Sequence, residues 1–209
     1  MTFPSGALTL EGAYYTSGDT EPEAAVVVCH PHPQYGGDMR NLVVSVIVRG
    51  ALDAGLGALT FNFRGVGRSQ GAYDGGAGER DDVRAALAWL RSREGVRRVA
   101  LAGYSFGAAM AAAAVDASVP ALALVALPAG MVRSDGAAGL AAYDGPVLLI
   151  SGQNDNISSE DALRQLAAGL PTRPEVVIVP GTDHFWWGQE RALADALCDF
   201  FARHLGGPA

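Results

Sequence analysis

The stretch GYSFG, residues 103–107, places a serine hydroxyl between two glycines at a spacing that can support nucleophilic chemistry. It joins an apolar run, typical of a buried strand, to an alanine-rich run, typical of a helix. In such a turn the serine stands above the sheet, and side chains at the two glycines would strike the neighbouring strand or helix. The stretch therefore predicts Ser105 as a nucleophile; the alternative is a tight turn in which Ser105 only caps the helix.

A carboxylate and an imidazole follow two later apolar runs. Asp155 lies just past residues 147–151, and His184 lies in the loop after residues 176–179. An imidazole, with a usual pKa of about 6.5, can take the serine proton, and a carboxylate can orient that imidazole. Taken alone, Asp155 is equally well read as a turn cap, and a lone loop histidine such as His184 is usually just exposed. Asp183 is a rival acid, but its reach to the adjacent histidine is poor.

The elements that must position these residues alternate along the chain. Strands that are short and continuously apolar, as strands covered on both faces are, are predicted at residues 25–29, 58–63, 99–104, 121–127, 147–151 and 176–179, with an edge strand at 8–15. Helices are predicted at residues 38–54, 79–91, 106–115, 160–168 and 189–205. This alternation predicts an α/β fold, a mostly parallel sheet with helices on both faces, in which ligands bind at the carboxyl ends of the strands. Because the sequence shows no repeat, linker or charge block, we expect a single domain over residues 1–209.

Composition excludes several classes of function. A net charge of −7 and a pI near 5 argue against nucleic-acid binding, which needs a basic stripe. The two cysteines form no metal spacing or disulfide framework, so a reducing, cytoplasmic location is expected. The N-terminus lacks the pattern of a signal peptide, and the most apolar stretch, residues 119–131, is too short to span a bilayer. His30 and His32 have no acidic cluster beside them, so we expect no metal and no cofactor.

Three segments carry a family resemblance: CHPHPQYGGDMRN at residues 29–41, FNFRGVGRSQG at 61–71 and AGYSFGA at 102–108. With them the chain resembles the α/β-hydrolase superfamily from about residue 24 to residue 205. Within it, the chain is similar to small bacterial hydrolases related to dienelactone hydrolases and the CocE/NonD group. The resemblance implies a nucleophile, an acid and a base in that chain order, matched by Ser105, Asp155 and His184.

The same resemblance implies an oxyanion hole made of two backbone N–H groups. Phe106, which follows the nucleophile, would supply one of them. Family members usually carry His-Gly-x after the first central strand, where this chain has His-Pro-His-Pro. Aligning the first histidine makes His32 the second donor, because the flanking prolines have no N–H. Gln34 and Tyr35 remain alternative donors.

Residues 128–145 lie where lids insert in this superfamily, and they are too few to form much of one. We therefore expect a minimal lid or none. Asp135 and Asp144 in this segment rank below Asp155 as the acid. Aromatic and apolar side chains near the inferred site could line an acyl pocket or, for the tryptophan pair, simply pack under the last helix: Tyr35, Met131, Phe185, Trp186 and Trp187.

Together these features predict a serine hydrolase of the carboxylesterase type, which cleaves esters or thioesters of small acyl groups through an acyl-enzyme. The expected partner is a small-molecule substrate, and no oligomeric state is indicated. A peptidase or acyltransferase could use the same residues, because pocket shape sets the leaving group and the acceptor. A binding module without catalysis, built on a hydrolase scaffold, is the remaining alternative.

Overall fold

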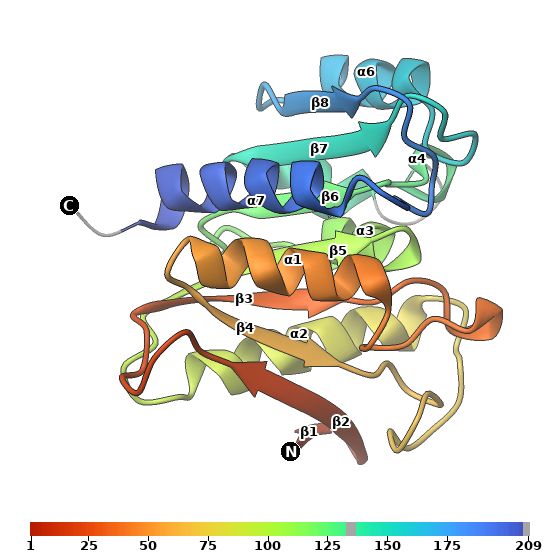
Figure 1. Ribbon diagram of the computed structural model, residues 1–209. Helices are drawn as coiled ribbons and strands as arrows, with labels where there is room; N and C mark the ends of the chain where they lie inside the picture. The colour runs from red at the N-terminus through yellow and green to blue at the C-terminus, as the bar shows by residue number, and fades with distance from the viewer. Residues whose placement is uncertain (133–136, 207–209) are drawn as a thin grey trace.

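The computed structural model describes residues 1–132 and 137–206, and its centre is one eight-stranded sheet in the order β1-β2-β4-β3-β5-β6-β7-β8 (Figure 1). The strands are β1 (Thr2–Ser5), β2 (Leu8–Tyr15), β3 (Ala24–Cys29), β4 (Gly57–Phe61), β5 (Arg98–Tyr104), β6 (Leu122–Val125), β7 (Val147–Gly152) and β8 (Glu175–Val179). β1 pairs antiparallel with β2, β2 pairs antiparallel with β4, and all other pairs are parallel. The predicted mostly parallel α/β sheet is therefore confirmed.

Helices cover both faces of this sheet. Two long helices, α1 (Leu42–Asp53) and α7 (Glu190–Leu205), lie side by side on one face (Figure 1). The opposite face is covered by α2 (Ala77–Arg91), α3 (Phe106–Ala114), α5 (Ala137–Ala142) and α6 (Glu160–Ala168). This arrangement is that of an α/β hydrolase, with the chemistry-bearing residues after the carboxyl ends of the parallel strands.

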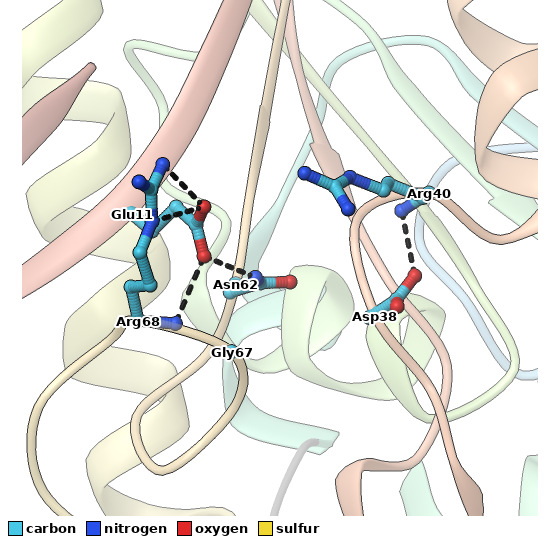
Figure 2. A pocket seen from close by; sticks show the side chains of 6 residues that line it. All are labelled: Glu11, Asp38, Arg40, Asn62, Gly67 and Arg68. Carbon is cyan, nitrogen blue, oxygen red and sulfur yellow. Dashed lines mark hydrogen bonds and ion pairs between the residues drawn. The ribbon is translucent and has the colours of Figure 1, made fainter.

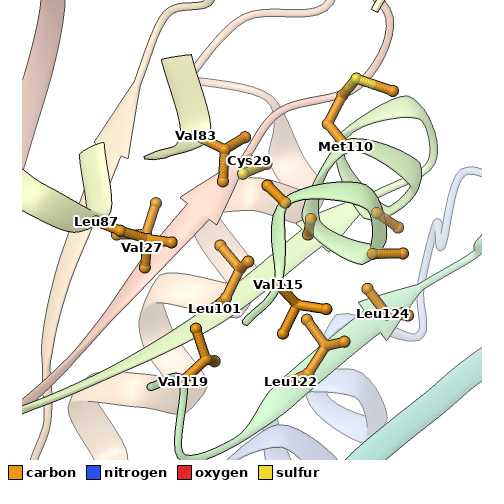
Figure 3. Packing of buried hydrophobic residues seen from close by; sticks show 14 of the residues in the cluster. Val27, Cys29, Val83, Leu87, Leu101, Met110, Val115, Val119, Leu122 and Leu124 are labelled. Carbon is orange, nitrogen blue, oxygen red and sulfur yellow. The ribbon is translucent and has the colours of Figure 1, made fainter. Parts of the chain in front are cut away.

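Strand β3 shows why the central strands are apolar at every position. Val27 and Cys29 face the core under α2 and α3, whereas Val26 and Val28 face the core under α1 and α7. All four side chains are fully buried. Figure 3 shows the first of these two cores, with Val27 and Cys29 packed beside Leu101. Strands buried on both faces form a rigid sheet, and the loops that follow the carboxyl ends of its strands are held in place by it.

Several boundaries differ from the sequence prediction for local reasons. β4 ends at Phe61, two residues early, because the N–H of Phe63 donates to the His30 ring rather than to a neighbouring strand. β6 ends at Val125 because Ala126 takes a φ of 48°. α1 begins at Leu42, where the Asn41 side chain accepts from the N–H of Val43 and caps the helix. The sequence did not predict β1 or the short helical turns.

The region where a lid would insert contains only short elements. Its described residues form α4 (Ala129–Met131) and α5, which is itself packed on α3. The fold is therefore lidless, as expected. Asp135, a lower-ranked candidate acid, lies outside the described residues. Within residues 1–132 and 137–206, the helices are all too short or too polar to cross a membrane.

Candidate active site

Ser105 stands on a sharp turn between β5 and α3. Its φ of 54° and ψ of −119° are unusual for a residue with a side chain, and such strain is typical of functional sites. A Cβ on Gly103 would strike the backbone of Gly107 at the start of α3, and a Cβ on Gly107 would strike the carbonyl groups of Cys29 and His30. The predicted reason for the two glycines is therefore confirmed: the start of α3 lies against the ends of β5 and β3, with no room for a side chain.

The structure brings Ser105, His184 and Asp155 together from the ends of β5, β8 and β7. His184 Nε2 lies 3.0 Å from Ser105 Oγ, and His184 Nδ1 lies 2.7 Å from Asp155 Oδ2. His184 lies 79 residues after Ser105 and 29 residues after Asp155 in the sequence. The Tyr104 hydroxyl donates to the His184 carbonyl at 2.9 Å and ties the histidine loop to the end of β5. The result is a continuous hydrogen-bonded chain from hydroxyl to carboxylate.

The Asp155 carboxylate is buried and held on both oxygens. Oδ1 accepts the N–H groups of Ile157 and Ser158 at 2.8 and 2.7 Å. Oδ2 faces His184, and the Ser151 hydroxyl lies 3.1 Å from it. Burial acts to raise the pKa of Asp155, but the hydrogen bonds from His184 and from these N–H groups outweigh it and hold the pKa below its usual value. The group is therefore a carboxylate with one oxygen committed to His184.

The two predicted oxyanion donors, Phe106 and His32, both border the cavity that Ser105 lines. Among the residues that the structure describes, neither the N–H of Phe106 nor that of His32 has a hydrogen-bond partner. Phe106 is the first residue of α3, so its N–H also lies at the positive end of a helix dipole. The His32 ring accepts from the N–H of Gln34 and starts the turn η1 (Pro33–Tyr35). Burial lowers the pKa of His32, so that ring is neutral near pH 7.

A cavity of about 500 Å³ lies over Ser105 and His184. Its walls are mostly apolar and aromatic: Pro31, Tyr35, Tyr104, Phe106, Pro128, Met131, Ile157 and Phe185. Tyr35, Met131 and Phe185 were expected from the sequence to lie near it. Tyr104, Pro128 and Ile157 were not, although each immediately precedes or closely follows a strand end, which is the signal that would have found them.

The expectation that Trp186 and Trp187 line the pocket is wrong. Trp186 is fully buried in the core under α7, and its backbone has a φ of 64°. Trp187 is 74% exposed and does not border the cavity. The stretch after His184 therefore sends Phe185 to the cavity, Trp186 to the core and Trp187 to solvent.

The remaining candidates lie elsewhere or have other partners. Asp183 is exposed and accepts the N–H of Phe185. Asp144 is exposed just before β7. Both ring nitrogens of His30 are used within the protein, at 2.6 Å from the Pro31 carbonyl and 3.0 Å from the N–H of Phe63. Across the described part of the chain, no group of three or more His, Cys, Asp or Glu side chains could hold a metal ion.

Comparisons with known proteins identify a matching family and several similar chains. The model of the X-Pro dipeptidyl-peptidase (S15) family matches residues 7–145. A serine hydrolase homologue from Coxiella burnetii is 33% identical, with 95% of each chain covered and a TM-score of 0.87. A serine hydrolase without lid from Xanthomonas campestris is 32% identical over 100% of this chain and 95% of that one, with a TM-score of 0.89. An uncharacterized protein from Rickettsia prowazekii is 32% identical over 91% of this chain and 83% of its own length.

Proposed function

The chain belongs to the X-Pro dipeptidyl-peptidase (S15) family and is a lidless α/β serine hydrolase. We propose that it hydrolyses carboxylic esters whose acyl group is small and carries no charge. The observation that carries the proposal is the hydrogen-bonded chain from Ser105 through His184 to Asp155 at the floor of an apolar cavity. Thioesters fit the same site, because the acyl group is bound in the same way. Carboxylesterase activity is the form of hydrolysis that this cavity supports best.

In the proposed mechanism His184 is the base and Ser105 the nucleophile. Nε2 takes the Oγ proton as Oγ attacks the carbonyl carbon, and Asp155 holds the opposite nitrogen protonated and stabilises the imidazolium. The tetrahedral oxyanion accepts from the N–H groups of Phe106 and His32. The alkoxide leaves with the proton carried by Nε2, which gives an acyl-enzyme and an alcohol. Water then attacks the acyl carbonyl carbon while Nε2 takes its proton, and the acid leaves as Nε2 returns that proton to Ser105 Oγ.

The lining of the cavity favours an ester over the peptide substrates that the family's name describes. An enzyme that removes an N-terminal dipeptide binds a free ammonium group, which calls for a carboxylate in the pocket. Among the described residues that border the cavity there is no Asp or Glu, and the polar side chains are those of Ser105, His184, His32, Asn41 and two tyrosines. A neutral acyl group is therefore the better match.

The size of the cavity favours short acyl chains. Tyr35, Ile157 and Phe185 at its edge are 88%, 56% and 58% exposed, so a chain that extends past them remains in contact with water. Each buried methylene contributes about 0.8 kcal/mol, and that contribution stops where the walls stop. Acetyl to butyryl groups are the proposed range.

The test is labelling with a fluorophosphonate probe followed by mass spectrometry, together with hydrolysis of p-nitrophenyl acetate. We expect the probe on Ser105, and we expect Ser105→Ala to abolish both labelling and turnover while the circular dichroism melt stays unchanged. A glycyl-prolyl p-nitroanilide substrate provides the peptidase arm. Turnover of that anilide in preference to the ester would replace the esterase assignment with a peptidase one. Labelling elsewhere would overturn the nucleophile.

A further inference from the structure

The loop that carries His32, residues 31–39, is held at both ends by two neighbouring residues. At its start, the His30 ring accepts the N–H of Phe63 at 3.0 Å. At its end, the N–H of Met39 donates to Asn62 Oδ1 at 2.9 Å. We call residues 31–39 the oxyanion loop. Asn62 and Phe63 follow β4 directly, and the oxyanion loop follows β3. The residues just after β4 therefore fix the loop that follows β3.

Asn62 is itself fixed by a hydrogen-bond network, of which Figure 2 shows the bonds of Glu11 with Asn62 and Arg68. Its Nδ2 donates to Glu11 Oε2 at 2.9 Å, and its own N–H donates to the Glu11 carbonyl at 2.8 Å. Its carbonyl accepts the Ser69 hydroxyl at 2.7 Å. Asn62 is only 4% exposed. A buried amide with this many partners has one orientation and one rotamer available.

The Glu11 carboxylate sets which way that amide faces. Glu11 is 5% exposed and accepts from the backbone N–H and the guanidinium of Arg68, each at 2.9 Å. The Arg68 N–H lowers the pKa of Glu11 more than burial raises it, and the Asn62 and Arg68 side chains lower it further. The group is therefore an anion that accepts only. Since the anion must face Nδ2, Oδ1 of Asn62 must face the N–H of Met39.

The oxyanion loop transmits the position of its end to His32, because it is closed on itself. The N–H of Gly37 donates to the His32 carbonyl at 3.0 Å, and a Cβ on Gly37 would strike the Pro31 and His32 carbonyl groups. Tightly packed backbone of this kind moves as a unit. A displacement of Met39 therefore displaces His32.

We propose that Asn62 is a positioning residue for the oxyanion hole: its hydrogen bond to Met39 holds the His32 N–H where the tetrahedral oxyanion forms. The proposal rests on the proposed esterase function of the same site. The substrate's acyl group meets the cavity walls and not Asn62, so Asn62 acts on the transition state more than on substrate binding. Glu11 supports this role by orienting the amide.

The experiment compares Asn62→Leu with wild type in p-nitrophenyl butyrate hydrolysis. Leucine has the same branching and the same number of side-chain heavy atoms, but it cannot accept from Met39. We expect kcat to fall by roughly 10- to 100-fold, short of the roughly 10²- to 10³-fold cost of deleting an oxyanion donor, with KM changed by less than about threefold. Asn62→Ala repeats the measurement if the leucine variant does not fold. Each variant is assayed well below its melting temperature.

Tyr143→Phe is the matched control. It removes one buried hydrogen bond of the same length, from the Tyr143 hydroxyl to the Val119 carbonyl at 2.9 Å, at the opposite end of the sheet from Ser105. We expect this variant to lose stability but keep the wild-type kcat. An equal fall of kcat in both variants would mean that Asn62 acts only through stability and would overturn the proposal.

A rescue variant separates orientation from bulk. In Asn62→Asp two carboxylates face each other, and we expect a low kcat. Adding Glu11→Gln replaces the repulsion of two carboxylates by a donor–acceptor pair of reversed direction, while the carboxylate introduced in place of the Asn62 amide would still accept from Met39. The new NH₂ group also faces the N–H of Arg68, which Glu11 Oε2 accepts in the native protein, so the recovery should be partial. The double variant should therefore exceed Asn62→Asp in kcat but stay below wild type, and no recovery would contradict the orienting role of Glu11. If wild type shows no esterase activity and no labelling at Ser105, the proposed function fails. If wild type is active and the Asn62 variants have the same kcat as wild type, only the positioning role fails.

Discussion

Replacing Asp155 by asparagine removes a charge and forces a choice of amide orientation. Oδ1 of Asp155 lies between the N–H groups of Ile157 and Ser158, which are both donors. An asparagine must therefore place its carbonyl oxygen there and its NH₂ group toward His184. The Ser151 hydroxyl, 2.9 Å from the Ser158 carbonyl, can donate to that carbonyl and accept from the NH₂, which reinforces this orientation.

This orientation disables the base. With a donor facing Nδ1, His184 must accept there and carry its proton on Nε2, the nitrogen that faces Ser105. The productive tautomer requires the amide to flip and leave two buried N–H groups facing an NH₂, at about 1–3 kcal/mol each. A cost of roughly 2–6 kcal/mol corresponds to a loss of about 30-fold to 10⁴-fold in rate. The comparable change in a serine protease costs roughly 10⁴ in kcat.

The assay is kcat for p-nitrophenyl acetate in Asp155→Asn and in Asp183→Asn. Asp183 is the matched control because it is the neighbouring carboxylate, is exposed, and accepts one N–H that an asparagine carbonyl accepts equally well. We expect a loss of at least about 30-fold for Asp155→Asn and a near wild-type kcat for Asp183→Asn. Equal losses in the two variants, or a fully active Asp155→Asn, would refute the reasoning.

Four further expectations follow from the same geometry. The kcat/KM for p-nitrophenyl esters from acetate to palmitate should peak at short chains, and a rise that continues beyond octanoate would reveal a longer acyl site. His184→Ala should abolish turnover and His204→Ala, at the end of α7, should not; the reverse would exchange their roles. Burial lowers the pKa of His30 from 6.5 to about 4, so between these pH values the unfolded chain binds a proton that the native protein does not. The free energy of unfolding should therefore fall by up to about 3 kcal/mol as the pH drops from 6.5 to about 4. An NMR titration of His30 with a midpoint near 6.5 would contradict this lowered pKa and the pH dependence drawn from it. Gly107→Ala should cost about 1–3 kcal/mol in urea unfolding, since its Cβ would meet the Cys29 and His30 carbonyls; an unchanged midpoint would show that the turn has room.

The sequence alone predicted the features that depend on local chain geometry. The glycine spacing around Ser105 requires a tight strand–turn–helix, and continuous apolar runs require strands covered on both faces. Because parallel strands bring their carboxyl ends to one edge, Asp155 and His184 could be expected beside Ser105 before any contact was seen. These inferences hold because each depends on a few neighbouring residues and on the periodicity of a strand.

Only the tertiary structure decided where individual side chains point after the strands end. Phe185 and Trp186 are adjacent, yet Phe185 borders the cavity and Trp186, with a φ of 64°, is buried under α7. Asn62 lies in the segment 61–71 that carries the family resemblance, but nothing in the sequence pairs it with Glu11, and the two meet because β2 pairs with β4 in a particular register. Loop dihedrals and strand register are set by packing across the whole sheet, and no local run of residues encodes them.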